Sequence, residues 1–159
     1  MFAAFKQLFD TIAAPPGGDD EHALRLATAV LLVETMRADA QVSAVERAHV
    51  LDVLRQRFGL DATETARLVA LGEEAAADAY DYHRFTSLLM RRFDLPRRAQ
   101  IIELMWQVAY ADGELSAHEN HLMRKIADLL YVGHADYHAA KVRARTAADL
   151  PRTDEDTLP

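Results

Sequence analysis

The sequence predicts an all-α protein, a single-domain helical bundle with an internal pseudo-twofold repeat. Apolar residues recur at spacings of three and four along most of the chain, which is typical of amphipathic helices and not of strands. Serine or aspartate precedes several of these periodic segments, and glycine or proline follows them, as expected at helix ends. An acidic turn also occurs twice, each time between two apolar helical patterns.

Composition narrows the class of protein and its compartment. The chain has 159 residues, half of them hydrophobic, which is enough for one domain with a proper core. Its formal net charge of -7 argues against a general nucleic-acid binder, because phosphate contacts need clustered positive charge. The absence of cysteine fits a reducing compartment, and we expect a cytoplasmic location. No apolar run reaches the length of a transmembrane helix.

Residues 1–18 are predicted to form an appended amphipathic helix and a linker. Phe2, Phe5, Leu8, Phe9 and Ile12 share one helical face, and Pro15-Pro16-Gly17-Gly18 ends the pattern. The favoured interpretation is that this helix docks on the bundle. The alternative is contact of residues 1–12 with a membrane surface or a partner helix, for which Lys6 alone provides a thin basic face.

Residues 19–146 are predicted to form the helical domain, and residues 147–159 an acidic disordered tail. The expected helices are 19–38, 43–58, 61–71, 81–93, 97–112, 116–131 and 135–145. In this prediction Gly59 and Gly72 end helices, Asp61 and Asp81 cap them, and Pro96 lies in a first turn, where proline is tolerated.

A shift of 73 positions superimposes the two halves of the helical domain without a gap. It places Leu31 on Leu104, Asp39 on Asp112, Ser43 on Ser116, Glu46 on Glu119 and Phe58 on Tyr131. This pattern predicts a duplicated helix–turn–helix unit, closed around a pseudo-twofold axis and connected by the helix that follows Asp81.

The two acidic turns have a purely structural interpretation. Ser43 with Glu46, and Ser116 with Glu119, spell the capping box S-x-x-E, in which the serine and glutamate side chains bind helix-start amides. The aspartate that opens each turn can accept local backbone amides in the same way. On this interpretation the turns only begin and end helices.

The functional interpretation rests on the helical faces that these acids share. Asp112 prolongs the apolar row of Ile101, Met105 and Val108, and Glu119 heads the row of Leu122, Met123, Ile126 and Leu130. Asp39 and Glu46 stand similarly in the first half, where Leu32 and Thr35 lead to Asp39 and Glu46 heads Val50, Val53 and Leu54. An inward-leaning carboxylate needs a proton, a hydrogen bond or a cation. Converging carboxylates and turn carbonyls would suit calcium or magnesium.

Other sequence patterns are weaker indications of function. The segment from Asp112 is too short for an EF-hand loop, and the helical pairs His118/His121 and His134/His138 do not form the H-E-x-x-H zinc motif. The clusters Arg91/Arg92/Arg97/Arg98 and Lys141/Arg143/Arg145 could hold an acidic partner, but solvated helix ends are the favoured interpretation. No nucleophile–base arrangement or phosphate-binding glycine motif is present.

The segments Met36–Glu46 and Val108–Glu119, with their shared A-D-x-x-[VL]-S-x-x-E pattern, resemble the tellurite-resistance TerB-like family. The resemblance covers about residues 20–145, and Phe85–Leu89, Glu103–Ala109 and Arg124–Leu130 look like an uncharacterised bacterial branch. It implies an all-helical bundle with pseudo-symmetry, an acidic surface and metal binding, and it does not imply an enzyme. Carried over residue by residue, it selects Asp39, Glu46, Asp112 and Glu119, with Glu114 as an additional ligand of the second turn. Ala40 and Gln41 depart from the pattern in the first turn.

Three hypotheses for function follow. The leading one is a non-enzymatic cytoplasmic binding or scaffold module that takes up Ca²⁺ or Mg²⁺ through its acidic turns and is linked to stress or metal response. The second is a metal-independent adaptor for a protein partner. The third is a metal-assisted hydrolase.

Overall fold

The computed structural model describes residues 3–13, 20–37, 43–74, 79–111 and 117–147. In these ranges the chain forms eight α-helices and no strand, which confirms the all-α fold class. None of these helices is long and apolar enough to span a bilayer. The chain separates into two compact units, Met1–Leu88 and Leu89–Pro159.

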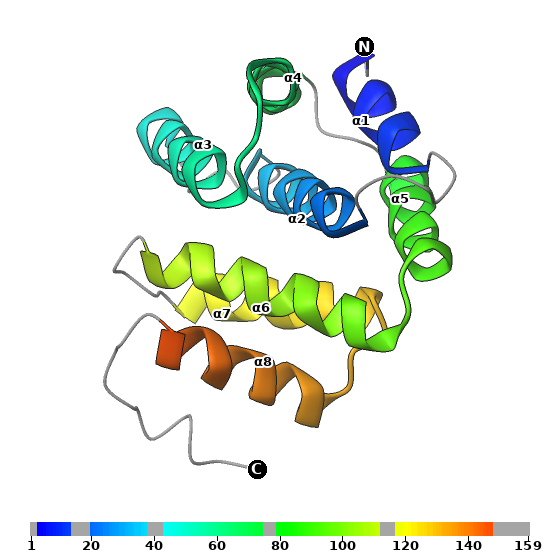
Figure 1. Ribbon diagram of the computed structural model, residues 1–159, viewed down its shortest axis with the longest axis vertical. Coiled ribbons are helices and arrows are strands. Elements are labelled where there is room, and N and C mark those ends of the chain that lie inside the picture. The colour runs from blue at the N-terminus through cyan, green and yellow to red at the C-terminus, as the bar shows by residue number, and fades with distance from the viewer. Residues whose placement is uncertain (1–2, 14–19, 38–42, 75–78, 112–116, 148–159) are drawn as a thin grey trace. The chain divides into compact units, whose positions relative to one another are not determined.

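The first unit is built around α2 (Asp20–Arg37). Figure 1 shows α1 (Ala3–Ala13), α3 (Ala44–Phe58) and α4 (Ala62–Glu73) arranged around it, and each of them contacts it. Every residue of α2 from 26 to 34 is buried, as expected for a helix that is mostly apolar all round. The buried Thr28 hydroxyl donates to the Leu24 carbonyl at 2.8 Å, so its polarity is satisfied within the helix.

The amino-terminal helix α1 docks on the first unit. Phe5, Leu8 and Ile12 are at most 7% exposed, and the helix contacts α4 as well as α2. The Phe5 ring meets Phe85 of α5 (Ala79–Arg92) edge-on, with centroids 5.7 Å apart. The favoured interpretation of this helix is therefore confirmed. Contact with a membrane or a partner through the same face would require α1 to leave its position.

The connections around α3 and α4 follow most of the expected signals. Ser43 caps α3, Gly59 closes it with a φ of 63°, and Asp61 with Glu64 forms a complete capping box at the start of α4. Gly72 does not end α4, which continues to Glu73. A Cβ atom on Gly72 would lie 3.8 Å from Val33 Cγ1, so this glycine sits inside a helix where α4 approaches α2.

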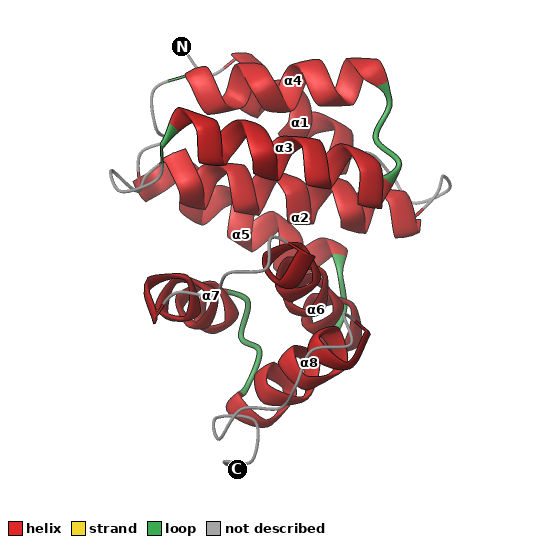
Figure 2. Ribbon diagram, turned by 90° about the vertical axis from the view of Figure 1, so that its left-hand side faces the viewer, coloured by secondary structure: helices red, strands yellow, loops and turns green. Residues whose placement is uncertain are grey.

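The second unit is built around α6 (Leu95–Ala111), which contacts α7 (Ala117–Leu129) and α8 (His134–Ala147). Figure 2 shows α7 and α8 against different sides of α6. The Asp94 carboxylate accepts from the Arg97 amide at 3.1 Å and caps α6, with Pro96 in the first turn as expected. The expected start of a helix at Asp81 is wrong, because α5 begins two residues earlier, at Ala79.

The helices α3 and α7 end with the same geometry, but one position out of the expected register. Gly59 and Tyr131 both have positive φ, and the following residues donate to the carbonyls of Arg55 and Ala127, five positions back. These ends match at a shift of 72, because Gly59 pairs with Tyr131. The expected pairing of Phe58 with Tyr131 is wrong, since Phe58 is 2% exposed and Tyr131 74%. The repeat as a whole stays a prediction.

Candidate functional site

Both acidic turns follow the central helix of a unit. The first lies between the end of α2 at Arg37 and the first turn of α3, which contains Glu46. The second lies between the end of α6 at Ala111 and the first turn of α7, which contains Glu119. The two motifs therefore occupy the same kind of connection, from the carboxyl end of a buried helix to the amino end of the next.

Of the five predicted ligands, only Glu46 has a described side chain. Asp39, Asp112 and Glu114 lie outside the described residues, and Glu119 belongs to α7 without a described side chain.

Glu46 is exposed. The prediction that its carboxylate leans towards the core is therefore wrong. The Ser43 hydroxyl accepts from the Glu46 amide at 3.1 Å and lies 3.1 Å from the Glu46 Oε1 atom, so the capping contact holds this side chain at the helix start. The fully buried row of α3 begins only at Leu54, while Val50 and Val53 are half-buried. An exposed carboxylate at this place is open to a ligand from solvent.

Helix electrostatics favour a cation at the start of the second turn. The last four carbonyl groups of a helix have no partner within it, and that end carries a partial negative charge. An aspartate placed there, such as Asp112 immediately after α6, adds negative charge to a negative end. α6 carries no basic residue in its own last turn to offset this charge. Carboxylate and carbonyl oxygens together are the ligands that Ca²⁺ and Mg²⁺ prefer.

The histidine pairs offer less to a metal. The rings of His134 and His138 stack along α8 with centroids 6.4 Å apart, and His121 is exposed. Within the part of the chain that the structure describes, no three His, Asp or Glu side chains gather as metal ligands would.

The basic clusters serve the packing of the second unit. The Arg98 guanidinium donates to the carbonyls of Leu130 and Phe93, each at 2.9 Å, and ties two helix ends together. Lys141 Nζ lies 4.9 Å from the Trp106 ring centroid, and Arg145 lies over Tyr110 at 5.3 Å. Arg143 pairs with Glu103 of α6. These contacts explain the positive charge of α8 without an acidic partner.

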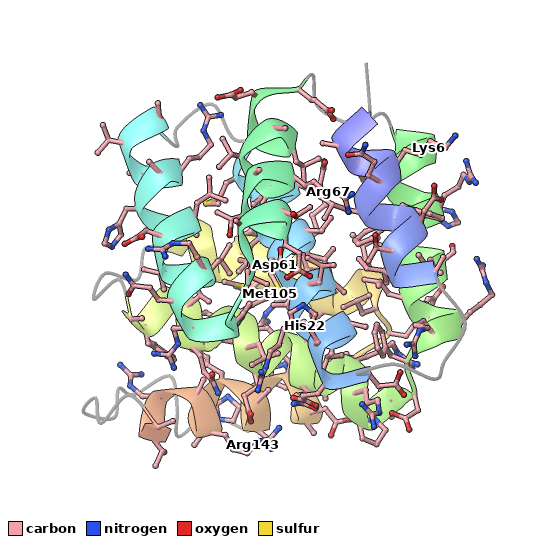
Figure 3. The ribbon with its side chains drawn as sticks, turned by 45° about the horizontal axis from the view of Figure 1, so that its top comes forward. Lys6, His22, Asp61, Arg67, Met105 and Arg143 are labelled. Carbon is pink, nitrogen blue, oxygen red and sulfur yellow. The ribbon has the colours of Figure 1, made fainter. Side chains whose placement is uncertain are left out.

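Two features of the first unit were not expected from the sequence. His22 Nε2 of α2 lies 2.6 Å from Glu64 Oε2, and the other Glu64 oxygen accepts from the Asp61 amide (Figure 3). The capping role of Glu64 was readable from its spacing to Asp61, but the approach of His22, 42 positions away, depends on how α4 packs on α2. An apolar groove between α3 and α4 is the second feature.

Fold and turns together define an all-helical protein in which an acidic connection follows the central helix of each of two units. The family model described as "Tellurite resistance protein TerB" matches residues 25–142. The chain belongs to this family. No curated protein matches the chain, and no solved structure does.

Proposed function

We propose that this protein is a non-enzymatic binding module whose two acidic turns take up a divalent cation, Ca²⁺ or Mg²⁺, in a response to metal or chemical stress. Its ligands are Asp39 and Glu46 in the first turn and Asp112, Glu114 and Glu119 in the second. The observation that carries the proposal is the position of both motifs, each at the carboxyl end of a central helix.

The two turns differ in strength. The second turn offers three carboxylates and the first only two, because Gln41 stands where the second has Glu114. Each additional carboxylate increases the affinity of a site for a divalent cation, so the second turn is the tighter site. The link to stress rests on the family's name, which refers to tellurite resistance.

Native mass spectrometry of the full chain with Ca²⁺, Mg²⁺ or Mn²⁺ tests the proposal. The variants are Asp39→Asn, Asp112→Asn and the two combined, which remove charge while keeping a side chain of the same shape. The wild type should hold up to two ions, each single variant one fewer, and the double variant none. Thermal melting should agree, because a ligand that binds only the folded chain raises its Tm.

Asp61→Asn is the matched control. Asp61 is an acidic helix cap outside the two turns, and asparagine caps helices about as well as aspartate. Its variant should bind ions as the wild type does. Equal ion uptake by the wild type and the Asp39→Asn, Asp112→Asn double variant would overturn the proposal and leave the turns as helix caps.

A further inference from the structure

The first unit carries an apolar groove between α3 and α4. It encloses about 360 Å³ and is open to solvent along one side. Val33 and Met36 of α2 line its floor, and Leu51 of α3 and Val69 of α4 line its two sides. Val69 is 40% exposed, so part of its apolar side chain faces solvent.

Three small residues, Ala44, Ala48 and Gly72, leave space in the groove. Ala44 and Ala48 line the α3 side, and Gly72 lets α4 approach Val33 without filling the space above it. Under the predicted shift of 73 positions, Val33 corresponds to Trp106, which is fully buried in the second unit and stacks on Tyr110. The second unit thus fills with its own rings the region next to its central helix where the first unit leaves a groove.

Four charged residues line the groove, Arg47, Asp52 and Arg55 on α3 and Glu73 on α4, and only two of them pair with each other. Asp52 and Arg55 pair with each other across 2.9 Å on α3. Arg47, one turn nearer the start of α3, is half-buried and has no side-chain partner among the described residues. A half-buried guanidinium beside apolar surface is best satisfied by a carboxylate, which it binds with charge-assisted hydrogen bonds.

We propose that this groove binds an amphipathic helix of a partner protein, one that carries an apolar stripe and an acidic residue facing Arg47. The groove runs between two helices of 15 and 12 residues, which lie side by side in Figure 3 and are roughly 18 to 22 Å long. A helix laid between them would insert residues at spacings of three and four towards Val33, Met36, Leu51 and Val69. This is the helix-in-groove mode of recognition.

Selection from a displayed library of helical peptides with randomised apolar and charged positions tests this. The full chain is the bait, and the Val69→Glu variant is used for counter-selection, because a charge there would be buried by an occupant. Enriched peptides should have apolar residues at helical spacing and at least one Asp or Glu. Their affinity is then measured by fluorescence anisotropy with labelled synthetic peptides.

Two matched pairs of variants locate the binding. Arg47→Glu should weaken it at least tenfold, whereas Arg57→Glu, an equal charge change at an exposed position of α3 outside the groove, should change it less than twofold. Val69→Glu should abolish binding and Val45→Glu leave it intact, since Val45 is 79% exposed and does not line the groove. A peptide with its acidic residue changed to lysine should regain affinity for Arg47→Glu. Circular dichroism confirms that each variant is folded.

Three results would overturn the proposal. One is that no peptide is enriched over the Val69→Glu counter-selection. Another is equal loss of affinity in Arg47→Glu and Arg57→Glu, which would indicate a general charge effect. The last is self-association of the full chain that Val69→Glu removes and Val45→Glu does not, which would make a second copy the occupant.

Discussion

The two units fill the space beside their central helix differently. In the first unit α4 meets α2 through small and aliphatic residues, with the His22–Glu64 contact as its polar link and a groove left open. In the second unit α8 packs on α6 through Trp106, Tyr137 and Lys141. The Tyr137 ring meets the Trp106 ring edge-on, and the Lys141 ammonium group lies over the Trp106 ring. In the second unit large rings fill the space beside the central helix, whereas in the first unit part of that space is left as an apolar groove.

The largest effect should come from Trp106→Ala in the second unit. Trp106 is fully buried against Tyr110, Tyr137 and Lys141, so its removal leaves a cavity and a buried ammonium group without its aromatic ring. We expect a loss of about 3 to 5 kcal/mol of unfolding free energy. Val33→Ala, in the central helix of the first unit, should cost no more than about 2 kcal/mol. Urea denaturation followed by circular dichroism measures both, and equal losses would contradict the comparison.

Leu8→Ala tests the docking of α1, a helix that only the first unit has. Leu8 is fully buried, and we expect the variant to lose about 2 to 4 kcal/mol and to expose α1 to limited proteolysis. Gln7→Ala, a change on the exposed face of the same helix, is the control. If both variants resist the protease as the wild type does, α1 contributes little to the unit.

Glu64→Ala tests the polar link between α2 and α4. The glutamate serves both His22 and the Asp61 amide and is 14% exposed, so its loss should cost about 1 to 2 kcal/mol. Glu46→Ala should cost less than about 0.5 kcal/mol, because its contact with Ser43 is exposed. Urea denaturation midpoints of the two variants compare their stabilities, and a larger loss of stability in Glu46→Ala than in Glu64→Ala would contradict the prediction.

The smallest effects concern the two helix ends. Gly59→Ala should destabilise by about 1 kcal/mol because alanine is strained at a φ of 63°, although nothing would crowd its Cβ. Tyr131→Gly should be neutral or stabilise by up to about 1 kcal/mol, since Tyr131 holds a φ of 54° while exposed. Gly133→Ala, whose Cβ would meet nothing within 4 Å, is the control and should be near neutral. Thermal melts resolve these shifts, and a loss of stability in Tyr131→Gly as large as that in Gly59→Ala would contradict the prediction.

Local signals in the sequence predicted most helix ends, because capping depends on neighbouring residues. Asp61 with Glu64 and Ser43 with Gly59 were readable in this way. Gly72 was misjudged, since its role depends on the approach of Val33 from another helix. Asp94 was not predicted to cap a helix, although its position three residues before Arg97 is a capping spacing.

The candidate site was predictable as a pair of turns but not as a geometry. Periodicity placed Glu46 on the core side of α3, and the structure shows it exposed, because a helix start can extend a full turn beyond the buried part of its face. The groove could not be predicted, since its lining residues come from three helices that meet only after folding.

The burial of Trp106 has a practical consequence for measuring how the protein unfolds. It is the only tryptophan in the chain, so its emission reports on the second unit while the first is silent at that wavelength. Circular dichroism, by contrast, registers helices in both units. If the two signals give one transition, the units unfold together; if emission and ellipticity change at different urea concentrations, each unit has a stability of its own.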